Sequence, residues 1–149
     1  MADAMARPAP RTFARHPIYS MFLPIPVICF IVTLLTDLAY QGSGGNLLWL
    51  NFSTWLNAAG LLFGAIAGVA LLVSLVIDVG LRRPGGWIHF LLLLAAWIVE
   101  FVNALVHARD GWTAVVPAGL ILSIIGVILI LASGWFWQSA RYGVDGDAR

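Results

Sequence analysis

The chain has 149 residues, of which 61% are hydrophobic and only 10% are charged. Soluble domains average roughly 25% charged residues, so this composition excludes an ordinary water-soluble globule and indicates a membrane protein. The net charge of +1 is too small for a nucleic-acid-binding protein. The single cysteine, Cys29, excludes an intrachain disulfide framework.

Four apolar runs are long enough to cross a bilayer as helices, since a hydrocarbon core about 30 Å thick needs ~20 helical residues. The connectors between these runs are short and rich in glycine, so neighbouring helices should be antiparallel. We therefore expect an all-α membrane protein, an up-down bundle of four transmembrane helices, with tails at residues 1–17 and 138–149. The expected spans are Ile18–Tyr40, Thr54–Val79, Trp87–His107 and Thr113–Trp137.

The arginines predict the orientation of the bundle, because the cytoplasmic flanks of membrane helices retain positive charge. All but one of them fall on the side of the membrane that holds both chain ends, and only Arg109 falls on the other side. Both termini are therefore expected in the cytoplasm. The arginines on the terminal side are Arg7, Arg11, Arg15, Arg82, Arg83, Arg141 and Arg149.

Small residues indicate where the helices pack closely. Gly60, Gly64 and Gly68 recur at four-residue intervals in the second span and predict a smooth groove on one helix face. Packing within the chain is the expected use of this groove, and homodimerisation is the alternative. The fourth span carries small residues at near-helical spacing that can form a partner surface: Gly119, Ser123 and Gly126.

The third span carries a narrow polar stripe. Ionisable side chains inside a membrane are costly and mark functional sites by default. At ~100° per residue, every strongly polar side chain of this helix falls on one face, which should point into the bundle. The stripe consists of His89, Ala96, Glu100, Asn103 and His107.

The outer half of this stripe meets polar residues of other spans. Asp37 near the end of the first span and Asn57 in the second lie at the level of Glu100, Asn103 and His107. Two carboxylates and a histidine can bind a divalent cation, hold a shared proton or relay protons. They can equally form a neutral, hydrogen-bonded structural patch with Glu100 protonated.

A second set of polar residues lies at the inner edge. His16 precedes the first span and His89 opens the third, so the two imidazoles should share a depth. Such a pair can ligate a haem iron axially or surround a smaller metal. Alternatively, Asp78 pairs with a histidine or with Arg82 and Arg83 at the interface. The chain contains none of the common nucleotide-binding or hydrolase motifs, so catalysis of those classes is not expected.

Short motifs from one end of the chain to the other form a recognisable pattern. They are His16-Pro17, Leu23-Pro24-Ile25-Pro26, Asp37-Leu38, Asp78, His89, Ser133-Gly134-Trp135 and Arg141-Tyr142-Gly143-Val144. In these motifs the chain resembles the bacterial predicted-membrane-protein family catalogued as domain of unknown function 2231. Gln138-Ser139-Ala140 stands where that family usually has an acidic residue.

The resemblance implies a bacterial inner-membrane protein associated with redox modules, since family members are joined to or encoded near quinoprotein dehydrogenases of the sorbosone-dehydrogenase type and Rieske-like domains. We expect a non-catalytic redox or anchoring subunit that binds b-type haem or quinone and relays electrons for a periplasmic dehydrogenase or other redox partner. His16 and His89 would be the axial ligands, Asp78 would orient one of them, and Arg82 and Arg83 would meet the propionates.

Two alternatives belong to other classes of protein. The first is a proton- or ion-handling membrane protein that uses the outer cluster of Asp37, Glu100, Asn103 and His107. The second is a structural membrane module that assembles through the glycine groove of the second span.

Overall fold

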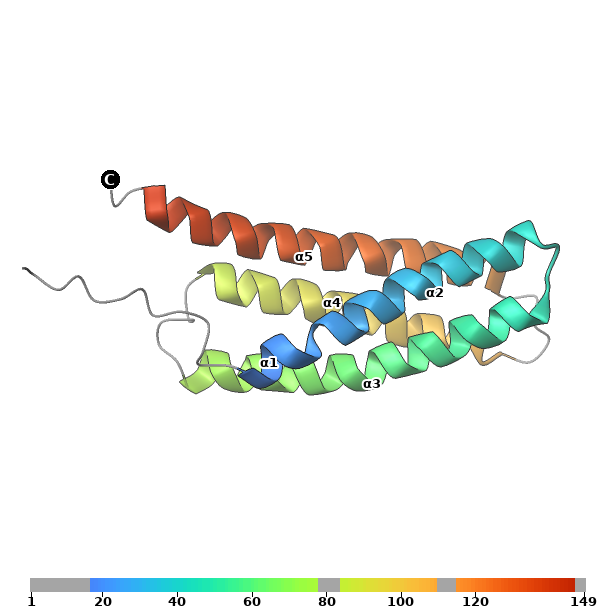
Figure 1. Ribbon diagram of the computed structural model, residues 1–149, viewed down its shortest axis with the longest axis horizontal. Helices are drawn as coiled ribbons and strands as arrows, with labels where there is room; N and C mark the ends of the chain where they lie inside the picture. The colour runs from blue at the N-terminus through green and yellow to red at the C-terminus, as the bar shows by residue number, and fades with distance from the viewer. Residues whose placement is uncertain (1–16, 78–83, 110–114, 147–149) are drawn as a thin grey trace, which may run out of the picture.

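The computed structural model describes residues 17–77, 84–109 and 115–146 of the chain. In these ranges the chain forms long helices that run up and down a common axis, and it contains no β-strand (Figure 1). Four helical segments are long and apolar enough to cross a bilayer. The predicted all-α bundle of four transmembrane helices is therefore confirmed.

The first span consists of two helices joined at Leu23. Helix α1 covers Pro17–Phe22 and helix α2 covers Pro24–Gly42. The interruption arises because Pro24 has no N–H to donate to the preceding turn. Leu23 keeps helical dihedral angles and its N–H donates to the carbonyl oxygen of Tyr19 at 2.9 Å, so the two helices form one span.

The remaining spans start earlier or end later than the expected boundaries. Helix α3 covers Leu47–Ile77 rather than beginning at Thr54, because the side-chain oxygen of Asn46 accepts the N–H of Leu48 at 3.0 Å and caps the helix. Helix α4 covers Pro84–His107. The fourth span opens with a short segment, η2, which covers Val115–Gly119 and is kinked at Val116 (φ −114°, ψ 125°). It continues in α5, which covers Leu120–Gly146.

The core of the bundle contains two apolar layers. Helix α2 packs mainly on α3, and α4 packs mainly on α5. One layer lies near the end of the bundle that holds α1 and consists of Tyr19, Ala67, Leu71 and Leu75 with their neighbours. The other, which we call the central layer, consists of Phe30, Ala96 and Ile130. The outer faces of all four spans expose large hydrophobic side chains, as expected for helices surrounded by lipid.

The glycines of α3 have different surroundings. A Cβ atom on Gly60 would lie 2.5 Å from Cε1 of Phe30, and one on Gly64 would lie 3.1 Å from Cδ1 of Trp97. A Cβ atom on Gly68 would meet nothing within 4 Å. The groove expected over all three glycines is therefore used for close helix packing at Gly60 and Gly64, while Gly68 borders open space.

We predict that Gly60→Ala destabilises the bundle by about 1–3 kcal/mol, because the new methyl group forces the Phe30 ring out of its position. Gly68→Ala is the matched control: it makes the same change on the same helix but meets no neighbour. Equilibrium unfolding in mixed micelles measures both free energies. Equal effects of the two substitutions would contradict the close contact at Gly60.

Candidate functional site

Buried polar side chains from all four spans meet near the end of the bundle where α2 joins α3. We call this group the distal cluster. None of its members is more than 8% exposed, so each polar atom depends on partners inside the protein. The cluster consists of Asp37, Ser53, Asn57, Glu100, Asn103, His107 and Ser123.

The carboxylate of Asp37 is the centre of the distal cluster. Its Oδ1 lies 2.9 Å from Nε2 of His107 and also accepts the hydroxyl of Ser53. Its Oδ2 accepts the hydroxyl of Ser123 at 2.5 Å. One side chain of α2 thereby binds groups from α3, α4 and α5, so Asp37 ties the four spans together.

A second carboxyl group, that of Glu100, is connected to this centre through Asn103. The Nδ2 of Asn103 donates to Oε2 of Glu100 at 3.0 Å and to Oγ of Ser123 at 2.8 Å. The Nδ2 of Asn57 donates to the backbone carbonyl of Glu100 at 3.3 Å. The structure thus brings together the residues that the sequence predicted for the outer cluster, Asp37, Glu100, Asn103 and His107, and places Asn57 beside them.

Three buried oxygen atoms of the distal cluster find no hydrogen-bond donor among the described residues. They are Oε1 of Glu100 and the Oδ1 atoms of Asn57 and Asn103. A buried acceptor without a partner costs about 1–3 kcal/mol. The cluster therefore has more hydrogen-bonding capacity than these residues use.

Small residues of α5 make room for the polar side chains of α4. A Cβ atom on Gly126 would overlap the carboxyl group of Glu100, and one on Gly119 would lie 3.1 Å from Cε1 of His107. The expected pairing of this α5 surface with the glycine groove of α3 is wrong for these glycines, because the long side chains of α4 occupy the space in front of them.

The divalent-cation interpretation of the outer cluster receives no support from the geometry. Among the residues that the structure describes, no three His, Cys, Asp or Glu side chains converge closely enough to hold a metal ion. Asp37 and His107 contact each other directly, whereas Glu100 reaches them only through Asn103 and Ser123.

A second buried group, which we call the proximal triad, lies toward the opposite end of the bundle. The hydroxyl of Tyr19 lies 2.5 Å from Nε2 of His89, and Nδ1 of His89 lies 2.6 Å from Oγ of Ser133. Ser133 donates its hydroxyl to the backbone carbonyl of His89 at 3.2 Å. We therefore assign the ring proton to Nδ1, so that Tyr19 donates to Nε2 and every polar group of the triad has a partner.

This geometry bears on the expected haem site. Both ring nitrogens of His89 contact protein partners, so in this arrangement His89 does not fit an axial iron ligand. His16, Asp78, Arg82 and Arg83 lie outside the described residues. Haem or quinone binding and the redox partner stay predictions of the family resemblance.

The hydroxyl partners of both clusters were not recognised as site residues from the sequence. Ser53 precedes Asn57 by one helical turn and thus shares its face, a signal that was available. Tyr19 and Ser133 lie on other spans than His89. The periodicity of a single helix cannot predict a contact between residues of different helices.

Four apolar helices with buried polar groups inside define an integral, multi-pass membrane protein. Residues 15–146 match the family described as Predicted membrane protein (DUF2231), and the chain belongs to this family. Comparisons with curated proteins and with solved structures give no match.

We predict that Gly126→Ala destabilises the protein by about 1–3 kcal/mol through overlap with Glu100. In a Glu100→Ala background the same substitution should cost much less, because the obstructing carboxyl group is gone. Gly134→Ala on the same helix, where a Cβ atom meets nothing within 4 Å, is the control. Unfolding free energies of the four members of the cycle give the coupling, and a coupling near zero would refute the contact.

Proposed function

We propose that this protein binds and exchanges protons inside the membrane, with the Asp37–His107 pair as the proton-holding site. The contact that supports the proposal is the 2.9 Å distance between Nε2 of His107 and Oδ1 of Asp37, in a pair closed off from solvent. Ionisable side chains inside a membrane-spanning segment are energetically costly, so a functional role is the default hypothesis for this pair.

Counting hydrogens supports one shared proton on this pair. The Nδ1 of His107 lies 2.9 Å from the backbone carbonyl of Asn103, which only accepts, so Nδ1 carries a hydrogen. Ser53 gives its hydroxyl hydrogen to Asp37. The Nε2 of His107 lies 2.9 Å from Oδ1 of Asp37 and 2.8 Å from Oγ of Ser53. With the Ser53 hydrogen directed at Asp37, one further proton must lie among these three atoms, because Nε2 and Oδ1 would repel each other as two bare acceptors. The proton resides on the imidazole or on the carboxyl group, and the pair is neutral overall in both cases.

Glu100 is the second proton-binding group of the proposal. The amide of Asn103 uses both its hydrogens, toward Glu100 and Ser123, and its oxygen accepts none from the described residues. The Asn103 amide therefore fixes the position of the Glu100 carboxyl group relative to Ser123, which in turn bonds to Asp37. It does not pass a proton from one carboxyl group to the other. Proton exchange at Glu100 therefore uses its unpaired Oε1, and its charge state influences Asp37 electrostatically.

The distal cluster is separated from the proximal triad by the central layer of Phe30, Ala96 and Ile130. These side chains carry no group that can accept or donate a proton. In this conformation proton exchange is therefore confined to the distal side. The proposal includes a transient opening of the central layer to water, by which protons cross the membrane.

Proton uptake into liposomes tests the proposal. Purified protein is reconstituted with a trapped pH-sensitive dye, and a potassium gradient with valinomycin drives proton entry. We expect flux above that of protein-free liposomes and a reduction of about tenfold or more in Asp37→Asn and in Glu100→Gln, since each removes a proton-binding group.

The matched control is Ser74→Ala, which removes a buried hydroxyl that, within the part of the chain that the structure describes, bonds to a carbonyl of its own helix and not to the distal cluster. Circular dichroism and thermal unfolding confirm that each variant is folded. Wild-type flux equal to that of empty liposomes, or full flux in the folded Asp37→Asn variant, would reject the proposal and favour a neutral structural patch.

We further propose that the protein lies in the bacterial inner membrane with both termini in the cytoplasm. The distribution of arginines supports this orientation, since Arg109 at the distal end is the exception among eight basic residues. It places the distal cluster toward the periplasm.

Cysteine labelling in intact cells tests the orientation. In a Cys29→Ser background, Ser43→Cys in the exposed α2–α3 connector should react with a membrane-impermeant maleimide. Ala148→Cys should react only after the cells are permeabilised. The reverse pattern would invert the topology.

A further inference from the structure

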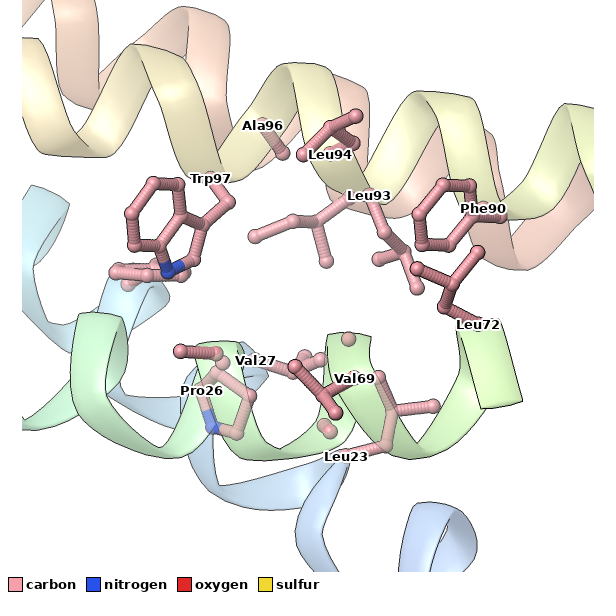
Figure 2. A pocket seen from close by; sticks show the side chains of 16 residues that line it. Leu23, Pro26, Val27, Val69, Leu72, Phe90, Leu93, Leu94, Ala96 and Trp97 are labelled. Atoms are coloured by element: carbon pink, nitrogen blue, oxygen red, sulfur yellow. The ribbon is translucent and has the colours of Figure 1, made fainter. Parts of the chain in front are cut away.

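An apolar cavity of about 270 Å³ opens between α3 and α4 at the middle of the bundle. Figure 2 shows side chains of α4, among them Leu93 and Trp97, on one side of the space, and Val69 and Leu72 of α3 on the other. Pro26 and Val27 of α2 also line the space, on the same side as Val69. Apart from the indole N–H of Trp97, the lining side chains are apolar, so the cavity is chemically distinct from both polar clusters.

The space exists because two of the α3 residues that line it are glycines, which have no side chain. Gly64 and Gly68 line the cavity, and a Cβ atom on Gly68 would meet nothing within 4 Å. Ala67 of α3 and Ala96 of α4 form buried parts of the wall. Protein interiors are normally packed to crystal density, so a space of this size in the centre of a bundle indicates room for another molecule.

The mouth of the cavity faces the surroundings of the bundle. Val69, Leu72 and Leu94 line the cavity and are 62%, 38% and 41% exposed. They belong to the middle of membrane-spanning helices, so the medium outside them is the hydrocarbon of the bilayer. Whatever enters the cavity laterally comes from that hydrocarbon.

The lining also restricts the chemistry of the occupant. The polar side-chain group in the lining is the indole N–H of Trp97, and it already donates to the backbone carbonyl of Leu61 at 2.9 Å. A quinone ring or lipid headgroup would find no hydrogen-bond partner among these side chains. Apolar cavities stay dry and take up apolar molecules, which excludes water as the natural occupant.

We propose that this cavity binds one acyl chain of a bilayer phospholipid, which enters between α3 and α4 while its headgroup stays outside the cavity. The chain fills the space left by Gly64 and Gly68 and packs on Trp97. The protein is thus a lipid-chain binder as well as a candidate proton-binding protein. No polar residue of the distal cluster lines the cavity, whereas the central layer of Phe30, Ala96 and Ile130 does.

Native mass spectrometry of the delipidated protein in detergent tests the proposal, with dioleoylphosphatidylethanolamine as the probe. We expect one saturable lipid adduct on the wild type, and about tenfold weaker binding of this lipid to Gly68→Leu, whose side chain fills the cavity. Gly134→Leu is the matched control, since it adds the same side chain to a glycine with open surroundings away from the cavity. It should bind the lipid as the wild type does.

A second variant, Leu72→Trp, narrows the mouth rather than the interior and replaces Gly68→Leu if that variant does not fold. Undiminished binding in the folded cavity variants, or no saturable adduct on the wild type, overturns the proposal. Preferential displacement of the phospholipid by an isoprenoid quinone, in the wild type and in Gly134→Leu, identifies the wrong occupant and rejects the acyl chain.

Discussion

The structure depends on one constraint: polar groups in hydrocarbon must find their partners inside the protein. Asp37 satisfies this constraint by accepting hydrogen bonds from Ser53, His107 and Ser123, each on a different span. Because leucine gains little by leaving lipid for another leucine, such contacts and close packing at small residues, rather than a hydrophobic drive, fix how the spans associate. A group that only one arrangement of four helices can satisfy also selects that arrangement.

The sequence predicted the parts of the site that lie on one helix. The 3.6-residue period placed Glu100, Asn103 and His107 on a single inward face, and all three are buried. Topology alone brought Asp37 to the same level. The hydroxyl groups of Tyr19 and Ser133 were missed as site residues because their contacts depend on the rotation of neighbouring helices, which no single-chain periodicity encodes. The sequence predicted membrane spans rather than helix ends, and the side chain of Asn46, which caps α3, was not recognised as the start of that helix.

Glycine spacing predicted helix proximity more reliably than it predicted the partner. Gly60 packs against the ring of Phe30, and Gly126 packs against the carboxyl group of Glu100. A Cβ atom on Gly68 would meet nothing within 4 Å. All three residues are glycines, and their roles differ only in which side chain of a neighbouring helix faces them. A pattern of small residues therefore shows that room exists, whereas the size and polarity of the facing side chain determine whether that room holds a helix, a carboxyl group or a lipid chain.

The order of polar and apolar residues along each span has a further consequence. Ala96 lies between His89 and Glu100 on α4, and Ile130 lies between Ser123 and Ser133 on α5. Phe30 occupies the same place in the first span, between Tyr19 and Asp37. The two polar clusters are thus kept apart by one continuous apolar layer, across which an unsolvated charge would be expensive. Each cluster must therefore balance its charge among its own members, and Phe30, packed against Gly60, is the residue by which the first span completes the layer.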